Sequence, residues 1–321
     1  MASSTVIQSA PPSAVRDFFR RLKVGEEFSY LLTLAAATLV LLIVGLIVYE
    51  LVINSTESFH KFGWHFFVTS VWDPNNDQFG ALPFIYGTCV TSALGLLLAV
   101  PAGVGAALFL AEMAPPRLSA ICVFMIELLA AVPSVIYGLL GIFILVPAIQ
   151  NYLYPLLKPL DFLPIFSGTF YGVSYLSAGI VLAIMVVPFI ISVSREVLLA
   201  VPTDQREAAL ALGATKWETT FQIVLPNAST GVIGSIFLGL ARALGETMAV
   251  TMVIGNVPKI SPSLLAPGYS IASVIANEFG EASPGLHLSS LIFLGLVLFG
   301  LTIVINAVAR LFILATTQRG A

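Results

Sequence analysis

Three ionisable side chains stand where an apolar chain would not ordinarily place a charge. Arg242 and Glu246 lie in Leu-Ala-Arg-Ala-Leu-Gly-Glu-Thr, residues 240–247, inside an apolar run, and Glu127 lies inside an earlier run. An arginine at the centre of a bilayer costs roughly 2.5 to 3.5 kcal/mol on insertion scales, so it usually faces a cavity or a partner. Its planar fork of donors matches a tetrahedral oxyanion. These residues are therefore candidates for the pathway of an anion.

The spacing of these residues suggests separate roles. Arg242 and Glu246 are four residues apart, which places them on one face of a continuous helix. Arg242 would supply a transient cationic contact for an oxyanion, and Glu246 would orient the guanidinium and keep the affinity low enough for release. The alternative is a structural ion pair that only holds the helices together. Glu127 either balances Arg242 and gates the path, or is a satisfied or protonated structural carboxyl.

Most of the chain consists of apolar runs that predict membrane helices. Hydrophobic residues make up 58% and charged residues 10% of the 321 residues, against about 25% charged residues in ordinary soluble domains. Helices of about 20 apolar residues cross a hydrocarbon core of about 30 Å. We expect an all-α polytopic membrane protein with six transmembrane helices, at residues 30–53, 85–111, 118–146, 176–197, 232–254 and 288–315. We also expect Pro133 to loosen the third span, its freed carbonyl being met by Ser134 or a neighbouring helix.

These spans imply a division of the chain and an orientation. Only Lys61, Lys158 and Lys259 fall outside, whereas most other Lys and Arg residues fall on the side of the N-terminus, so the positive-inside rule puts both termini in the cytoplasm. The first apolar run is too long for a signal peptide and is interpreted as a retained anchor. The expected parts are a cytoplasmic tail with an amphipathic interfacial helix (1–28), the first span (29–54), an extracytoplasmic loop (55–84), a core of five helices (85–315) and a cytoplasmic C-terminal tail (316–321).

Several other classes of protein are disfavoured. The formal net charge is −3, and the basic residues gather at span ends and not on one patch that could follow a nucleic-acid backbone. No G-x-x-x-x-G-K-[S/T] loop occurs, so the chain is not expected to hydrolyse ATP by itself. An intramembrane metalloenzyme is disfavoured because there is no H-E-x-x-H, and the histidines lie in outer loops or at a span edge. Cys89 and Cys122 lie in different spans and are expected to be unbridged.

The loop between the fourth and fifth spans, residues 202–226, is more polar than its surroundings and predicts a helix-turn-helix in the cytoplasm. Asp204 and Glu207 match the capping-box pattern, and Gly213 suits the left-handed residue that ends a helix. Ala208 and Ala209 make the first helix thin, so it could enter a narrow groove on another protein. A connector whose alanines merely pack is the alternative.

The same loop resembles a family signature, EAA-x3-G-x9-I-x-LP, of the membrane subunits of bacterial ABC importers. The matching residues are Glu207, Ala208, Ala209, Gly213, Ile223, Leu225 and Pro226. The resemblance implies the type I ABC importer permease fold, with this loop forming the coupling helix that docks into a separate ATPase subunit.

Three further segments resemble the phosphate-specific branch of that family, the PstC type of permease: residues 79–88, 133–138 and 241–247. In that branch the intramembrane Arg and Glu, which fall on Arg242 and Glu246 here, are implicated in phosphate passage. The resemblance implies a bacterial plasma (inner) membrane protein in a complex with a PstA-like second permease subunit, a PstB-like ATPase dimer and a PstS-like extracytoplasmic phosphate-binding protein. No cofactor is expected on this chain, since ATP and Mg would be used by the ATPase.

The sequence is also compatible with two other transport functions. One is a permease for another oxyanion, such as sulfate, molybdate or phosphonate. The other is an ion-driven secondary carrier, in which Glu127 and Glu246 would act as proton sites.

Overall fold

The computed structural model describes residues 26–317, which are helical apart from loops and two isolated β-bridges. Residues up to Ile53 and residues from Asn54 onward form two separate units. The described part of the first unit belongs to one helix, α2 (Glu26–Asn54), of 29 residues, whose last residue is assigned to the second unit. At 1.5 Å per residue this helix is about 43 Å long, which is enough to cross a bilayer. A helix of spanning length thus lies where the first span was predicted. Most of the amphipathic helix predicted within residues 1–28 lies outside the described residues.

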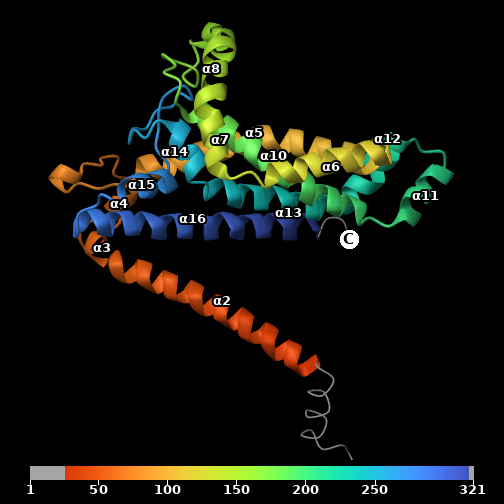
Figure 1. Cartoon of the computed structure of the whole chain (residues 1–321), viewed down its shortest axis with the longest axis horizontal. Coiled ribbons are helices and arrows are strands. Elements are labelled where there is room, and N and C mark those ends of the chain that lie inside the picture. The colour runs from red at the N-terminus through yellow and green to blue at the C-terminus, as the bar shows by residue number, and fades with distance from the viewer. Residues whose placement is uncertain (1–25, 318–321) are drawn as a thin grey trace, which may run out of the picture. The chain divides into compact units, whose positions relative to one another are not determined.

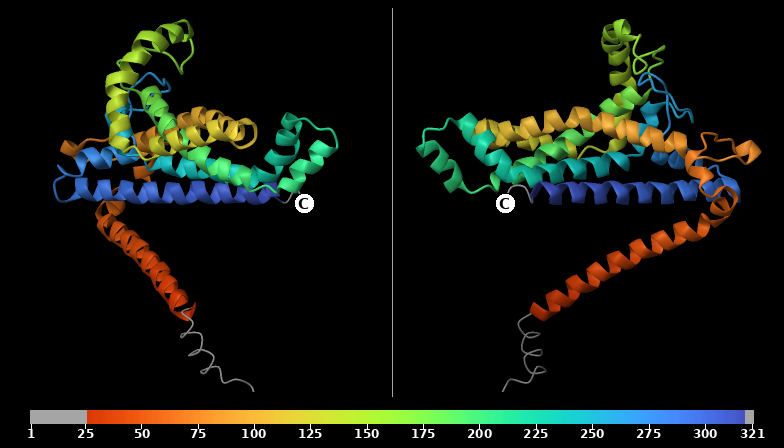
Figure 2. Two further views of the ribbon diagram at one scale, coloured as in Figure 1. Left: turned by 45° about the vertical axis from the view of Figure 1, so that its right-hand side comes forward. Right: turned by 180° about the vertical axis from the view of Figure 1, so that it is seen from behind.

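The second unit is a set of long helices that run alongside one another, with one helical segment that rises steeply away from them (Figure 1). The helices that run together are α5 (Leu82–Leu108), α6 (Pro116–Ala130), α10 (Tyr175–Leu199), α13 (Leu225–Leu244) and α16 (Leu286–Thr317). Figure 2 shows the same arrangement from two other sides.

The shorter elements continue or connect these helices. The π-helical turn η2 (Phe109–Met113) extends α5, and α12 (Lys216–Thr219) and the π-helical turn η6 (Thr220–Val224) run into α13. The rising segment comprises α7 (Ser134–Leu140), η3 (Gly141–Leu145), α8 (Val146–Ala148), η4 (Ile149–Leu153), α9 (Tyr154–Leu157) and η5 (Lys158–Leu160). The remaining elements are α3 (Thr56–Phe62), α4 (His65–Val68), η1 (Pro74–Asn76), α11 (Thr203–Ala211), α14 (Met248–Ile254) and α15 (Ile271–Glu278).

Six helical stretches among the described residues are long and apolar enough to cross a membrane, as expected from the sequence. The third stretch differs from its prediction, because α6 ends at Ala130 and a new helix starts at Ser134. Pro133 has extended backbone angles and lacks the N–H that a continuous helix needs. With 15 residues, α6 is only about 22 Å long, so the apolar stretch of spanning length is instead Ser134–Leu160.

The predicted fifth span, 232–254, is also not one helix. The spanning stretch runs from Lys216 to Leu244, and α14 is a separate helix after the break at residues 245–247. Apolar residues lie on both sides of Gly245-Glu246-Thr247, and for this reason the sequence predicted one continuous span.

The outer loop predicted at residues 55–84 is folded onto the start of α16. The backbone N–H of Ser58 donates to Ser289 Oγ at 3.1 Å, and the ring of Phe66 stacks on Phe293 with centroids 4.5 Å apart. The Nε1 of Trp72 donates to Glu278 Oε2 at 2.9 Å. This carboxylate also pairs with His287 at 3.1 Å. The loop is therefore held by the protein itself.

Close packing of α5 against α10 forms the centre of the second unit. Ala99 of α5 and Leu182, Val186 and Ile190 of α10 belong to one buried cluster. At Gly103 the two helices approach so closely that an added Cβ would lie 2.8 Å from Cγ2 of Ile190. Because Gly103 has no side chain, α5 and α10 can pack closely and form one block.

We expect Gly103→Ala to destabilise the protein by about 1 to 3 kcal/mol, because the new methyl group overpacks the contact with Ile190. The matched control is Gly105→Ala in the same helix, where an added Cβ meets nothing within 4 Å. This control should be neutral or slightly stabilising, since alanine is the better helix former. Thermal unfolding of the two purified variants in detergent checks the prediction, and equal unfolding temperatures would contradict it.

Candidate functional site

The helix α11, which carries the signature residues, starts and ends at backbone features that can be traced to the sequence. Pro202 precedes it with extended backbone angles, and Gly213 follows it at φ +89°, the left-handed conformation expected there. The expected capping box of Asp204 and Glu207 is wrong, because Asp204 already lies inside the first turn of α11. The capping box is instead formed by Thr215 and Glu218 at the start of α12.

The helix α11 has an exposed face and a buried face. Glu207 and Ala208 are exposed, whereas the neighbouring Ala209 is buried. Leu212, just after the helix, is 91% exposed. At the end of the second unit where α11 lies (Figure 1), the signature therefore presents side chains that this chain leaves uncovered.

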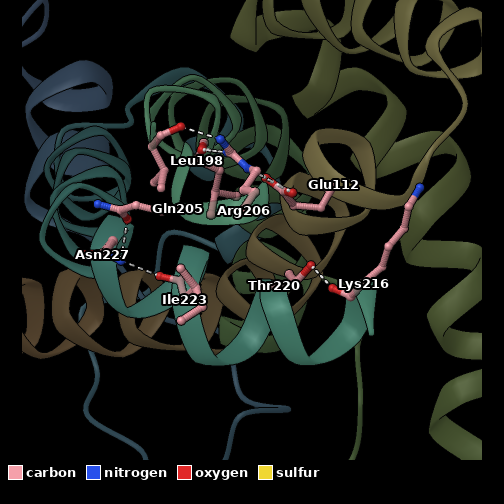
Figure 3. Close-up of polar contacts among 9 residues, drawn as sticks. Glu112, Leu198, Gln205, Arg206, Lys216, Thr220, Ile223 and Asn227 are labelled. Carbon is pink, nitrogen blue, oxygen red and sulfur yellow. Dashed lines mark hydrogen bonds and ion pairs between the residues drawn. The ribbon is translucent and has the colours of Figure 1, made fainter. Parts of the chain in front are cut away.

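The two halves of the signature are joined by a side-chain hydrogen bond. Asn227 Nδ2, one residue after Pro226, donates to Gln205 Oε1 on α11 at 3.0 Å and to the carbonyl oxygen of Ile223 at 2.8 Å (Figure 3). Because Ile223 and Leu225 lie where η6 passes into α13, this bond connects α11 with the start of the helix that carries Arg242.

A second connection of α11, made by Arg206, was not predicted from the sequence. Arg206 Nη2 donates to Glu112 Oε1 at 2.9 Å and to the carbonyl oxygen of Leu198 at 2.7 Å, and Nη1 donates to the carbonyl oxygen of Val201 (Figure 3). We call these four residues the Arg206 clamp. The side chains of Arg206 and Glu112 are only 17% and 11% exposed. The sequence shows only two opposite charges on one predicted side of the membrane, 94 residues apart, which does not indicate that they meet.

The two breaks in the predicted spans lie in the same part of the core. Val132, at the first break, and Ala243, beside the second, pack in one buried cluster. At the first break the hydroxyl of Tyr137 donates to the carbonyl oxygen of Leu129 at 2.7 Å. From the sequence, Ser134 or a neighbouring helix was the expected partner of the freed carbonyl. Irregular backbone at membrane depth requires such internal partners.

Arg242 lies next to the second break, in the last turn of α13. Its side chain is exposed on this chain, and its Cζ lies 5.8 Å from the ring centroid of Phe189 on α10. A cation over an aromatic face is favoured by the ring quadrupole, and a cation at the C-terminal end of a helix is favoured by the helix dipole. The guanidinium is thus held at one side by Phe189.

Glu246 and Glu127 do not occupy the positions that the sequence suggested. Since α13 ends at Leu244, Glu246 does not share a helical face with Arg242, and its Oε1 accepts the backbone N–H of Ala249 at 3.2 Å, at the start of α14. Glu127 is exposed on α6, although burial in the protein was expected from its place in an apolar run. None of the ion pairs found between residues 26 and 317 joins Arg242 to either carboxylate.

Comparisons with known proteins agree with this arrangement. Residues 99–317 match the family described as binding-protein-dependent transport system inner membrane component. The phosphate transport system permease protein PstC of Xylella fastidiosa (strain 9a5c) is 44% identical over 324 residues, 99% of each chain. PstC of Haemophilus influenzae (strain ATCC 51907 / DSM 11121 / KW20 / Rd) is 44% identical over 308 residues, 94% of this chain and 97% of that protein.

A solved structure shows the same fold. A chain of the MetNI methionine ABC transporter, in an inward-facing conformation, superposes with a TM-score of 0.51, 18% identity and coverage of 74% of this chain and 94% of that chain. The expected ABC importer permease fold is thereby confirmed. The chain belongs to the family of binding-protein-dependent transport system inner membrane components, and it is a multi-pass permease subunit of an ABC importer, not an enzyme.

Proposed function

We propose that this chain is one of two unlike permease subunits of an ATP-driven importer of inorganic phosphate. The observation that carries the proposal is the identity of 44% over 99% of both chains with a protein named as a phosphate permease. The exposed Arg242 beside two helix breaks supports it, because a guanidinium there can contact a tetrahedral oxyanion.

Transport would proceed by alternating access. A PstS-like extracytoplasmic protein would deliver phosphate to the outer loops, and a PstB-like ATPase dimer, which uses ATP and Mg, would bind α11. A PstA-like subunit would cover surface that this chain leaves exposed, including the faces that carry Glu127 and Arg242. Both termini would be cytoplasmic, and no cofactor would bind to this chain.

Arg242 should be needed for transport but not for assembly. We expect Arg242→Gln to lower ATP-driven phosphate uptake by at least about tenfold, since a hydrogen bond to a charged group contributes about 1.5 to 3 kcal/mol. Uptake is measured with labelled phosphate in proteoliposomes that contain the whole complex. Arg117→Gln, which removes an exposed cation in the first turn of α6, is the control and should transport normally. Normal uptake by Arg242→Gln would contradict the pathway role.

The same assay separates the alternative functions. Competition by sulfate, molybdate or phosphonate at concentrations equal to that of phosphate would indicate another oxyanion as cargo. Uptake that survives depletion of ATP and collapses with the proton gradient would indicate an ion-driven carrier, with Glu127 and Glu246 as the proton sites to test.

The exposed face of α11 should be the docking site of the ATPase. We expect Glu207→Lys and Ala208→Leu each to reduce the amount of ATPase that co-purifies by about tenfold or more, because they place a reversed charge or extra bulk in a desolvated contact. The control Ala36→Leu lies in α2, outside the part of the chain that matches the family model. Unchanged co-purification of both α11 variants would remove α11 as the docking helix.

The side of the membrane on which α11 lies is a test of the proposed orientation of the chain. With Ala208→Cys in a background in which Cys89 and Cys122 are replaced, we expect a membrane-impermeant thiol reagent to label position 208 only after the cytoplasmic face is opened. The physical reason is the excess of Lys and Arg on this side of the spans. Labelling in intact cells would place α11 outside and would contradict the proposal.

A further inference from the structure

We propose that Arg206 is a positioning residue that fastens α11 to the ends of α5 and α10, so that these two helices receive the movement of α11 together. This inference rests on the proposed function, because it concerns how force from the ATPase enters the permease. The residues involved form the Arg206 clamp, Glu112, Leu198, Val201 and Arg206.

Every nitrogen of the Arg206 guanidinium is engaged. Nε lies 3.3 and 3.4 Å from the two carboxylate oxygens of Glu112, and Nη2 lies 2.9 Å from Oε1 of the same residue. Nη2 and Nη1 also donate to the carbonyl oxygens of Leu198 and Val201. The planar fork of arginine suits such contacts in several directions, whereas lysine would offer one compact ammonium group.

The two carbonyl contacts stiffen the connection between α10 and α11. The last carbonyl groups of a helix have no partner within the helix, and a cation there is also favoured by the helix dipole. Arg206 contacts the carbonyls of Leu198, in the last turn of α10, and Val201, in the connection itself. Through these bonds α11 is braced against the end of α10, and residues 200–202 are less free to act as a hinge.

The contact with Glu112 attaches α11 to a helix that is not its neighbour in the sequence. Glu112 lies in η2, which extends α5. Because α5 and α10 already pack as one block through Gly103 and Ile190, the clamp fixes α11 to the common end of that block. A displacement of α11 is therefore passed to both helices at once.

The other link from α11 is weaker. Gln205 and Asn227 share one neutral amide hydrogen bond of 3.0 Å, and both residues are exposed. Charge-assisted bonds are shorter and about twice as strong as neutral ones, and partial burial reduces competition from water. The strongest side-chain attachment of α11 thus leads to the α5 and α10 block and not to the start of α13, the helix that carries Arg242.

The test is the number of phosphate ions imported per ATP hydrolysed by the whole complex in proteoliposomes. We expect Glu112→Gln and Arg206→Gln to lower this ratio by at least about fivefold, as is consistent with losing a partly buried charge-assisted contact, while the ATPase still co-purifies and hydrolyses ATP. The double variant should be no worse than Arg206→Gln alone, because both changes remove one interaction. Arg206→Lys should give an intermediate ratio.

The matched control is Glu196→Gln, which removes the carboxylate that pairs with Arg195 at 3.0 Å near the end of α10. This carboxylate is 73% exposed, so its loss should leave the ratio unchanged.

Two outcomes would overturn the clamp. One is an unchanged ratio in Glu112→Gln and Arg206→Gln. The other is loss of the ATPase from the purified complex, which would make Arg206 a docking residue. Should Arg206→Gln fail to assemble, Glu112→Gln and Arg206→Lys decide the question, since both keep the cation. Failure of the proposed function can be distinguished from failure of the clamp proposal, because the wild-type complex itself would then not import phosphate on addition of ATP. In that case the clamp proposal would fall as well.

Discussion

The main constraint on this structure is that every backbone N–H and C=O group in the hydrocarbon region needs a hydrogen-bond partner within the protein. In the hydrocarbon region no water replaces a missing partner, so a helix can be interrupted only where other groups take over its hydrogen bonds. The break before Ser134 is accompanied by the hydroxyl of Tyr137, which donates to the carbonyl oxygen of Leu129. The break after Leu244 is accompanied by Glu246, which accepts the backbone N–H of Ala249. Both breaks border one buried cluster of side chains, and this is where Arg242 lies.

The two arginines of interest show how burial and pairing separate a structural role from a role in binding. All three nitrogens of Arg206 have acceptors, and its side chain is mostly buried. Such a group is well suited to hold elements in place and poorly suited to exchange ligands, because each bond would have to break first. Arg242 instead is exposed on this chain and has the face of Phe189 on one side. Its donors are available to an anion or to a partner subunit.

The long helices and the signature loop could be predicted because they depend on local patterns. Apolar runs of sufficient length give membrane helices wherever they occur, so the helices around Leu82, Tyr175 and Leu286 were expected close to their observed positions. Gly213 could be placed for a similar reason, since a left-handed residue after a helix favours glycine. The cap of α11 was placed wrongly because the helix starts at Thr203, directly after Pro202, so Asp204 lies inside it, and a capping residue must stand outside the helix.

By itself the sequence determined the class of protein, the number of spanning stretches and the loop that carries the family signature, because composition, periodicity and short motifs act over neighbouring residues. Only the tertiary structure decided that α6 ends at Ala130, where Pro133 predicted no more than a loosened helix, and that α13 ends at Leu244. Apolar residues on both sides of each interruption are compatible with one span as well as with two helices. The tertiary structure also decided that Glu246 turns to the start of α14, and that Glu112 meets Arg206 across 94 residues of chain. Contacts between distant residues depend on how whole helices pack, and no local pattern in one sequence encodes that packing.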